Sequence, residues 1–154
     1  MESEVKELYG EKLKEFEGKL GVSFCDKSLL IKALSHRSRL EAGLTSKKEN
    51  KKLGLIGDKL IDLVLFESAY NKGLSPEEMD RRRQQYSSRQ ALNSAMRSIM
   101  AEPPWFLNPG TERRTREKSA KLGEDTFEAL VGAIYLDKEY QKAAEFVVEK
   151  LLGK

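Results

Sequence analysis

Two carboxylates stand in the most apolar stretch of the chain and could do metal chemistry there. Residues 122–137 read LGEDTFEALVGAIYLD, and Glu128 is the only charge between Thr126 and Leu136. Asp125 lies three residues earlier, so both side chains share one face of a helix. Burying an unpaired carboxylate is costly, and such a group normally meets a cation or a hydrogen-bond donor. Taken alone, this stretch favours a structural interpretation over a metal site. In that interpretation the acids lie near a helix N-terminus and pair with Lys or Arg.

The composition excludes several other chemistries. The 154 residues include one cysteine, Cys25, and one histidine, His36, so neither a Cys/His zinc site nor an internal disulfide can form. The sequence lacks glycine-rich phosphate-binding loops, and we interpret His36 as a structural histidine rather than a base. No apolar run approaches the ~20 residues that cross a bilayer, and the polar N-terminus is no signal peptide. We predict a cytoplasmic protein without a membrane partner that uses carboxylates and a hard cation, or simply binds.

The elements that position these acids are predicted to be helices, because no stretch alternates with period two. We therefore expect an all-α protein that forms a single domain over residues 1–154. A polar loop or a short broken helix is expected over residues 39–50, and a basic, turn-rich loop over residues 108–121. Helices are predicted over residues 2–20, 27–35, 51–73, a segment from Pro76, a segment after Ser87 or Ser88, residues 122–137 and residues 139–152.

A third acid lies in the helix predicted over residues 51–73. Asp58 stands beside Ile56 and Leu60 rather than on an obviously solvated face, and Asp62 follows one turn later. Because Asp58 is far from Glu128 in the chain, only the fold can bring the two acids together.

Three stretches in register resemble the endonuclease domain of the ribonuclease III family. They are LGVSFCDKSLLIKALSHRSR at 20–39, NKKLGLIGDKLIDLVLFESAY at 50–70 and KLGEDTFEALVGAIYLD at 121–137. Their order and spacing follow that family over nearly the whole chain. The resemblance implies an all-α endonuclease domain that forms a homodimer and hydrolyses double-stranded RNA with Mg²⁺, for which Mn²⁺ can substitute. It also implies that the chain ends directly after this domain, without a double-stranded RNA-binding domain.

The same resemblance assigns roles to the acids. Asp58 and Glu128 match catalytic positions, and Asp58, Asp125 and Glu128 match metal ligands. Two positions depart from the signature, because Lys51 and Gly54 stand where it carries glutamates, and the glutamate at position 54 is normally a metal ligand. The compact mini-ribonuclease III branch also lacks that glutamate, so Gly54 alone does not imply an inactive enzyme. Asp62 and Glu124 are candidates to compensate.

Basic residues form two groups that could bind an RNA duplex, which proteins recognise mainly through phosphates and 2′-hydroxyls. The alternative is that these basic residues form an ordinary solvent-exposed helix face. Only some of Arg81–Arg83 can point toward RNA, because three consecutive residues face different directions. The predicted RNA-binding residues are Arg81, Arg82, Arg89, Arg97, Arg113, Arg114, Arg116, Lys118 and Lys121.

Three hypotheses follow from these residues. The first is a metal-dependent endoribonuclease for double-stranded or structured RNA, motivated by Asp58, Asp125 and Glu128. The second, motivated by Lys51 and Gly54, is a member of the same fold that binds RNA or a ribosomal or processing partner without cutting. The third is an all-α protein–protein module, which leaves the acids in an apolar helix unexplained.

Overall fold

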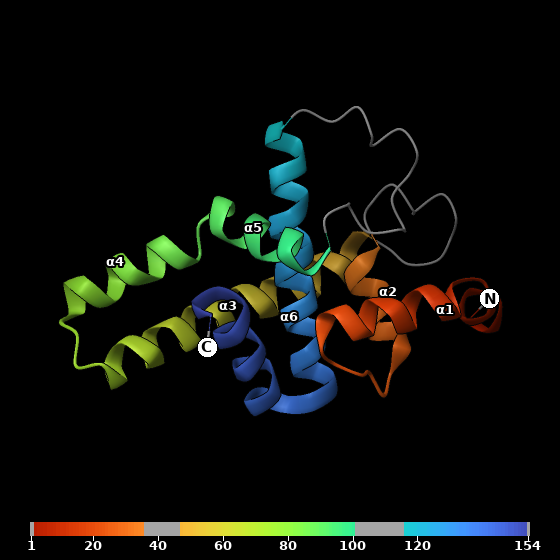
Figure 1. The fold of residues 1–154 in the computed structure, drawn as a ribbon, viewed down its shortest axis with the longest axis horizontal. Helices are drawn as coiled ribbons and strands as arrows, with labels where there is room; N and C mark the ends of the chain where they lie inside the picture. Colours follow the sequence, from red (N-terminus) through yellow and green to blue (C-terminus); the bar gives the residue numbers. More distant parts are fainter. Residues whose placement is uncertain (1, 36–46, 101–115, 154) are drawn as a thin grey trace.

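Every element in the described part of the chain is a helix, so the all-α prediction is confirmed (Figure 1). The computed structural model describes residues 2–35, 47–100 and 116–153. The elements are α1 (Glu2–Leu20), α2 (Lys27–Leu34), α3 (Lys47–Asn71), α4 (Pro76–Tyr86), α5 (Arg89–Ile99), α6 (Arg116–Val147) and the short π-helical turn η3 (Val148–Leu152).

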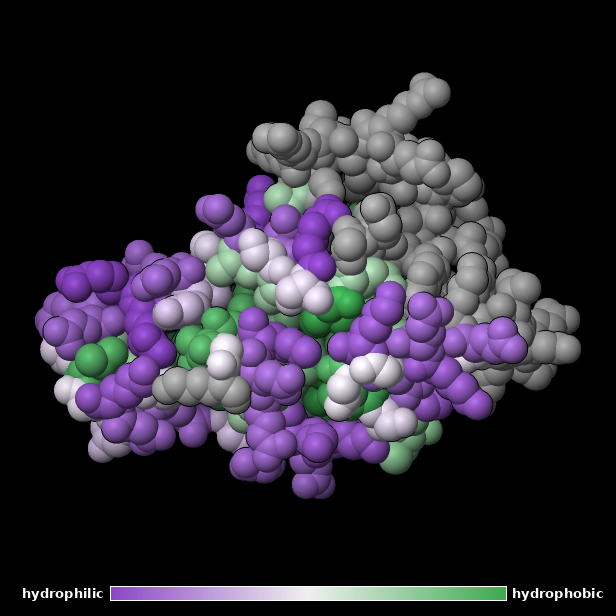
Figure 2. All heavy atoms as spheres, viewed as in Figure 1, coloured by the Kyte–Doolittle hydropathy of each residue, from purple (hydrophilic) through white to green (hydrophobic). Residues whose placement is uncertain are grey.

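The apolar stretch identified in the sequence forms the central helix of the fold. Helix α6 packs against α2, α3 and α5, and Figure 1 shows it crossing the middle of the molecule. Phe127, Leu130 and Ile134 are completely buried in one hydrophobic cluster that α1, α2, α3 and α5 also supply. Helix α4 buries no residue and runs along the outside beside α3. On the face shown in Figure 2, hydrophilic side chains predominate and hydrophobic ones appear in small separate groups.

A sharp turn divides α6 after the predicted core stretch. Glu139 has φ 68°, the left-handed region that non-glycine residues seldom adopt. The second part of α6 therefore folds back, and Phe146 stacks on Phe127 with ring centroids 5.7 Å apart. The separate helices predicted over residues 122–137 and 139–152 thus meet at this turn.

Helices α3 and α6 touch backbone to backbone at two glycines. A Cβ atom on Gly57 would overlap the backbone carbonyl of Glu128, and one on Gly132 would overlap that of Leu53. Glycine is the residue that allows such an approach, because it has no side chain. The contact places Asp58, which follows Gly57, beside the helical turn that carries Glu128.

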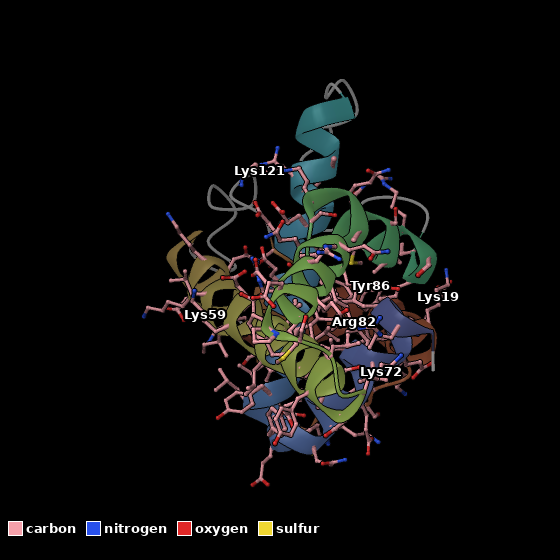
Figure 3. All side chains as sticks on the ribbon, turned by 90° about the vertical axis from the view of Figure 1, so that its left-hand side faces the viewer. Lys19, Lys59, Lys72, Arg82, Tyr86 and Lys121 are labelled. Atoms are coloured by element: carbon pink, nitrogen blue, oxygen red, sulfur yellow. The ribbon has the colours of Figure 1, made fainter. Side chains whose placement is uncertain are left out.

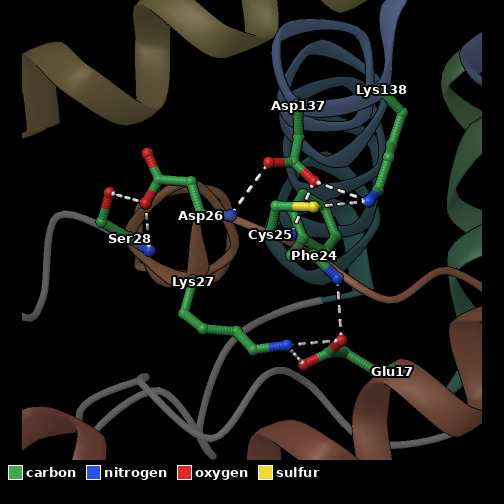
Figure 4. Close-up of polar contacts among 8 residues, drawn as sticks. All are labelled: Glu17, Phe24, Cys25, Asp26, Lys27, Ser28, Asp137 and Lys138. Atoms are coloured by element: carbon green, nitrogen blue, oxygen red, sulfur yellow. Dashed lines mark hydrogen bonds and ion pairs between the residues drawn. The ribbon is translucent and has the colours of Figure 1, made fainter.

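Asp137, at the end of the core stretch, ties the start of α2 to α6 (Figure 4). Its carboxylate is only 4% exposed and accepts hydrogen bonds from the backbone N–H groups of Cys25 and Asp26, each 2.9 Å long. Asp26 in turn caps α2 by accepting from the N–H of Ser28, as its place in the sequence predicts. The last acid of the core stretch therefore has a structural role.

Glu17 shows how this fold neutralises a structural carboxylate (Figure 4). Its side chain is 7% exposed, and Lys27 Nζ lies 2.7 Å from Oε1. The N–H of Phe24 donates to the other oxygen at 2.9 Å. A short charged contact and a backbone donor together satisfy this acid, as burial requires.

The loop predicted over residues 108–121 is wrong at its end, because α6 begins at Arg116. Helix α3 begins at Lys47, which agrees with the helical alternative for the end of residues 39–50. Residues 39–46 and 108–115 lie outside the described residues. The side-chain amide of Asn50 bonds the carbonyls of Lys32 and Ala33, which anchors the early turn of α3 to the end of α2. These turns carry few apolar residues, so hydrophobic periodicity could not reveal them.

The backbone contact predicts different outcomes for two glycines of α3. Gly57→Ala should lower the free energy of unfolding by about 1–3 kcal/mol, because the new methyl group forces α3 and α6 apart. Gly54→Ala is the matched control, since a Cβ there meets nothing within 4 Å. It should raise stability by up to about 1 kcal/mol through helix propensity. Urea unfolding followed by circular dichroism measures both, and equal effects would contradict the close contact.

Candidate metal centre

Three acids of α6 form a cluster near its N-terminal half. One carboxylate oxygen from each of Glu124, Asp125 and Glu128 lies within 4.8 Å of the others. The spacing of one, three and four residues places these side chains on adjoining parts of one helical face. The structure thus brings Asp125 and Glu128 together and adds Glu124.

Asp58 reaches this cluster from α3. Its carboxyl group lies near that of Glu128, across the backbone contact at Gly57, although it is outside the 4.8 Å group formed by the three acids of α6. Burial is the largest of the effects that raise the pKa of Glu128 from 4.5 to about 9. The hydrogen bond with Asp58 and the charges of Asp58, Glu124 and Asp125 raise it further. Without a cation, Glu128 therefore keeps its proton at neutral pH.

No Lys or Arg in the described part of the chain forms an ion pair with Glu128. The other acids have only long contacts with bases: Arg89 Nε lies 3.4 Å from Glu124, and Lys121 Nζ lies 3.5 Å from Asp125. Charge-assisted bonds are typically 2.7–2.9 Å long, and exposed pairs of this kind contribute little. Lys121 and Asp125 lie four residues apart on α6, so their contact is local to that helix.

The donor set fits a hard divalent cation. All four side chains offer carboxylate oxygens, which Mg²⁺ and Mn²⁺ prefer, and Mg²⁺ commonly takes one or two of them while keeping several waters. A Cβ on Gly54, one turn before Asp58 on α3, would meet nothing within 4 Å, so that side of the site has room. A cation would also relieve the crowding of negative charge around Glu128.

Asp62 lies beside the site but outside the three-acid cluster. Burial raises its pKa, and the charge of Asp58 raises it further, whereas Arg83 and Lys59 lower it. Lys59 is 81% exposed and extends outward in Figure 3. Of the two acids considered as substitutes for a carboxylate at Gly54, Glu124 is therefore the one that joins the cluster.

The predicted RNA-binding residues divide into several environments. Arg81 is exposed on α4, whereas Arg82 stacks over Tyr86 with 5.0 Å from its Cζ to the ring centroid (Figure 3). Arg97 is partly buried on α5. Arg89 and Lys121 flank the acids through the contacts with Glu124 and Asp125. Arg113 and Arg114 lie outside the described residues, as do the side chains of Arg116 and Lys118, whose backbone begins α6.

Two features of the site escaped the sequence analysis. The contact of Arg89 with Glu124 joins residues 35 positions apart, and no local pattern indicates it. Gly57 and Gly132 did leave a signal, because a glycine inside a helical pattern often marks a close packing contact.

The fold and the carboxylate cluster can be compared with known proteins. The family model described as Ribonuclease-III-like matches residues 26–154. Ribonuclease 3 of a Nitratiruptor species is 31% identical over 141 residues, which cover 90% of this chain and 60% of that protein. Ribonuclease 3 of Bacillus cereus is 28% identical over 151 residues, covering 96% of this chain and 62% of that protein.

Solved structures show the same fold. The nuclease domain of ribonuclease III from Campylobacter jejuni superposes with a TM-score of 0.75 at 23% sequence identity, covering 92% of this chain and 99% of that domain. The fold is therefore that of a ribonuclease III nuclease domain. The family model also matches most of the sequence, so the chain belongs to the ribonuclease III-like family. It spans about 60% of the length of the two curated relatives. Among the described helices, none has the length and apolar character needed to cross a membrane.

The raised pKa of Glu128 predicts how stability depends on pH when EDTA removes divalent ions. The folded protein holds the Glu128 proton more tightly than the unfolded chain does. This stabilisation is complete below about pH 4.5 and is lost as the pH rises toward 9. Glu128→Gln, which stays neutral, should therefore be more stable than the wild type at pH 8, with the difference shrinking toward pH 5.

Urea unfolding at several pH values measures this difference, with Glu11→Gln on the exposed surface of α1 as the control for charge. Addition of Mn²⁺ should stabilise the wild type at pH 8 and leave Glu128→Gln almost unchanged. A pH-independent difference between the two proteins would show that Glu128 is ionised throughout.

Proposed function

We propose that this chain is a metal-dependent endoribonuclease that hydrolyses phosphodiesters in double-stranded or structured RNA. The observation that carries the proposal is Glu128, which meets three other carboxylates from two helices and no paired base in the described part of the chain. Glu17 shows that a purely structural acid of this fold has a lysine at 2.7 Å. Family membership supports RNA as the substrate.

Residues of the protein itself would position the ligands of the cation. Asp58 and Glu128 are held near each other by the backbone contact between α3 and α6, and Glu128 would have to give up its proton to hold a cation. When bound, the divalent ion lowers the pKa of a water molecule and stabilises charge on the phosphate oxygens. Asp125 adds oxygen donors at the more exposed edge of the cluster, where its side chain is 37% exposed.

Basic side chains beside the cluster suit an RNA duplex. Arg89 and Lys121 are 45% and 57% exposed at the edge of the acidic cluster, and Arg81 is exposed on α4. Their charges attract phosphates without reading base sequence, so duplex binding should weaken steeply with salt. These residues balance the negative field that the acids would otherwise present to RNA.

The homodimer that the family resemblance implies is part of the proposal. Leu55, Leu63 and Tyr70 on α3 are 61%, 50% and 75% exposed, and their spacing places them on one side of the helix. Large apolar side chains exposed in a row are typical of surfaces that associate. The nuclease domain from Campylobacter jejuni has a structurally flexible region that is involved in dimer formation. We therefore propose that a second copy covers this side of α3.

The second candidate is a protein of this family that binds RNA, or a ribosomal or processing partner, without cutting it. Gly54 favours this candidate, because it removes a carboxylate from the position where the family signature has one. RNA binding would then depend on the basic residues alone and would not change in Glu128→Gln.

Cleavage of a long RNA duplex tests the first proposal. The wild type should cut in Mg²⁺ or Mn²⁺, and Asp58→Asn or Glu128→Gln should lower the rate at least about a hundredfold by removing a metal-binding oxygen. Glu11→Gln on the exposed surface of α1 should keep wild-type activity. If the wild type cuts nothing at any concentration of either ion, yet binds duplex as well as Glu128→Gln does, the second candidate replaces the first.

Sedimentation equilibrium tests the dimer. Leu63→Lys should shift the protein toward monomer, because burying a lysine against a second copy is costly. Gln141→Lys adds the same charge at an exposed position on α6 and should leave the association unchanged. A wild type that stays monomeric at high concentration would contradict the proposed interface.

A further inference from the structure

We infer that Glu124 is a ligand of the divalent cation and supplies the carboxylate that α3 lacks at Gly54. The inference rests on the proposed metal site and goes beyond it, because it changes which helix provides the fourth acid. Three acids would then come from α6 and one, Asp58, from α3.

The position of Glu124 on α6 supports its role as a ligand. It lies four residues before Glu128 and therefore on the same side of α6, where its oxygen falls within the 4.8 Å cluster. Its side chain is 20% exposed, compared with 37% for Asp125, so it lies deeper in the protein. The charge of Glu124 also acts on Glu128, which places the two acids in one electrostatic site.

The open space at Gly54 on α3 also supports this role for Glu124. Gly54 and Asp58 share a side of α3, since they are four residues apart. A Cβ at Gly54 would meet nothing within 4 Å, so a side chain can start from this position without a clash. Glu124 and a glutamate at position 54 would approach the cluster from different helices, and the protein has one of the two.

The contact with Arg89 does not account for Glu124. Arg89 Nε reaches one oxygen, Oε1, at 3.4 Å, whereas Lys27 reaches Glu17 at 2.7 Å. A carboxylate accepts several hydrogen bonds or metal contacts at its two oxygens, so this long bond leaves Glu124 able to bind a cation. Arg89 is suited to orient Glu124 from outside the cluster.

Direct titration with Mn²⁺, followed by the electron paramagnetic resonance signal of the free ion, tests the inference without measuring cleavage. Glu124→Gln should weaken Mn²⁺ binding about tenfold or more. Gly54→Glu introduced into Glu124→Gln should recover most of that loss, because it restores the fourth carboxylate from α3. Asp62→Asn removes an acid outside the cluster and should change the affinity little.

A structural role for Glu124 would give a different pattern. Glu124→Gln would then bind Mn²⁺ like the wild type and lose only thermal stability, to the same extent as Arg89→Ala. Glu124→Asp, which keeps the charge but retracts the oxygens, separates these cases. It should weaken Mn²⁺ binding if Glu124 is a ligand, and unchanged binding would overturn the inference.

The outcomes also separate this inference from the proposed function. If Mn²⁺ binding depends on Glu124 but the wild type cuts no RNA, the ligand assignment holds and the nuclease proposal fails. If the wild type cuts RNA while Glu124→Gln binds Mn²⁺ normally, the nuclease proposal holds and the ligand assignment fails. A wild type that binds no Mn²⁺ would overturn both.

Discussion

The close approach of α3 and α6 is the constraint on which the site depends. Helices packed through ordinary side chains have axes about 8–10 Å apart. Here Gly57 meets the backbone of Glu128, and Gly132 meets that of Leu53, with no space for a methyl group. Asp58 has a short side chain, and this approach brings its carboxyl group close to that of Glu128. The candidate metal site, the elevated pKa of Glu128 and the proposed chemistry all depend on these two glycines.

Holding four acids together costs stability, and the hydrophobic core must offset it. Phe127, Leu130 and Ile134 surround the acidic turn of α6 and are fully buried, so the helix cannot rotate the acids away from the site without exposing them. Without a cation, Glu128 retains its proton, and this lowers the repulsion among the acids. A carboxylate kept for stability alone would look like Glu17, with a lysine and a backbone donor beside it.

Local patterns were predictable from the sequence, and tertiary contacts were not. Ser75 and Glu78 form the capping box that starts α4, and Asp26 caps α2, because these interactions involve residues two or three positions apart. The apolar stretch at residues 122–137 and its acids Asp125 and Glu128 could also be identified from the sequence. The contact of Arg89 with Glu124 depends on how α5 and α6 pack, so no local pattern of the sequence indicates it. The convergence of Asp58 with Glu128 came from family resemblance rather than from periodicity.

Moving a carboxylate from α3 to α6 changes what the site requires of the fold. Donors on one helix keep their relative positions whenever that helix is intact, whereas donors on two helices depend on the packing between them. With Glu124, Asp125 and Glu128 on α6, the crossing needs to position only Asp58. Position 54 is then free of charge, and the exposed Lys51, one turn earlier, makes this side of α3 less repulsive to phosphates. The departures from the family signature are therefore compatible with a working site that has redistributed its charges between two helices.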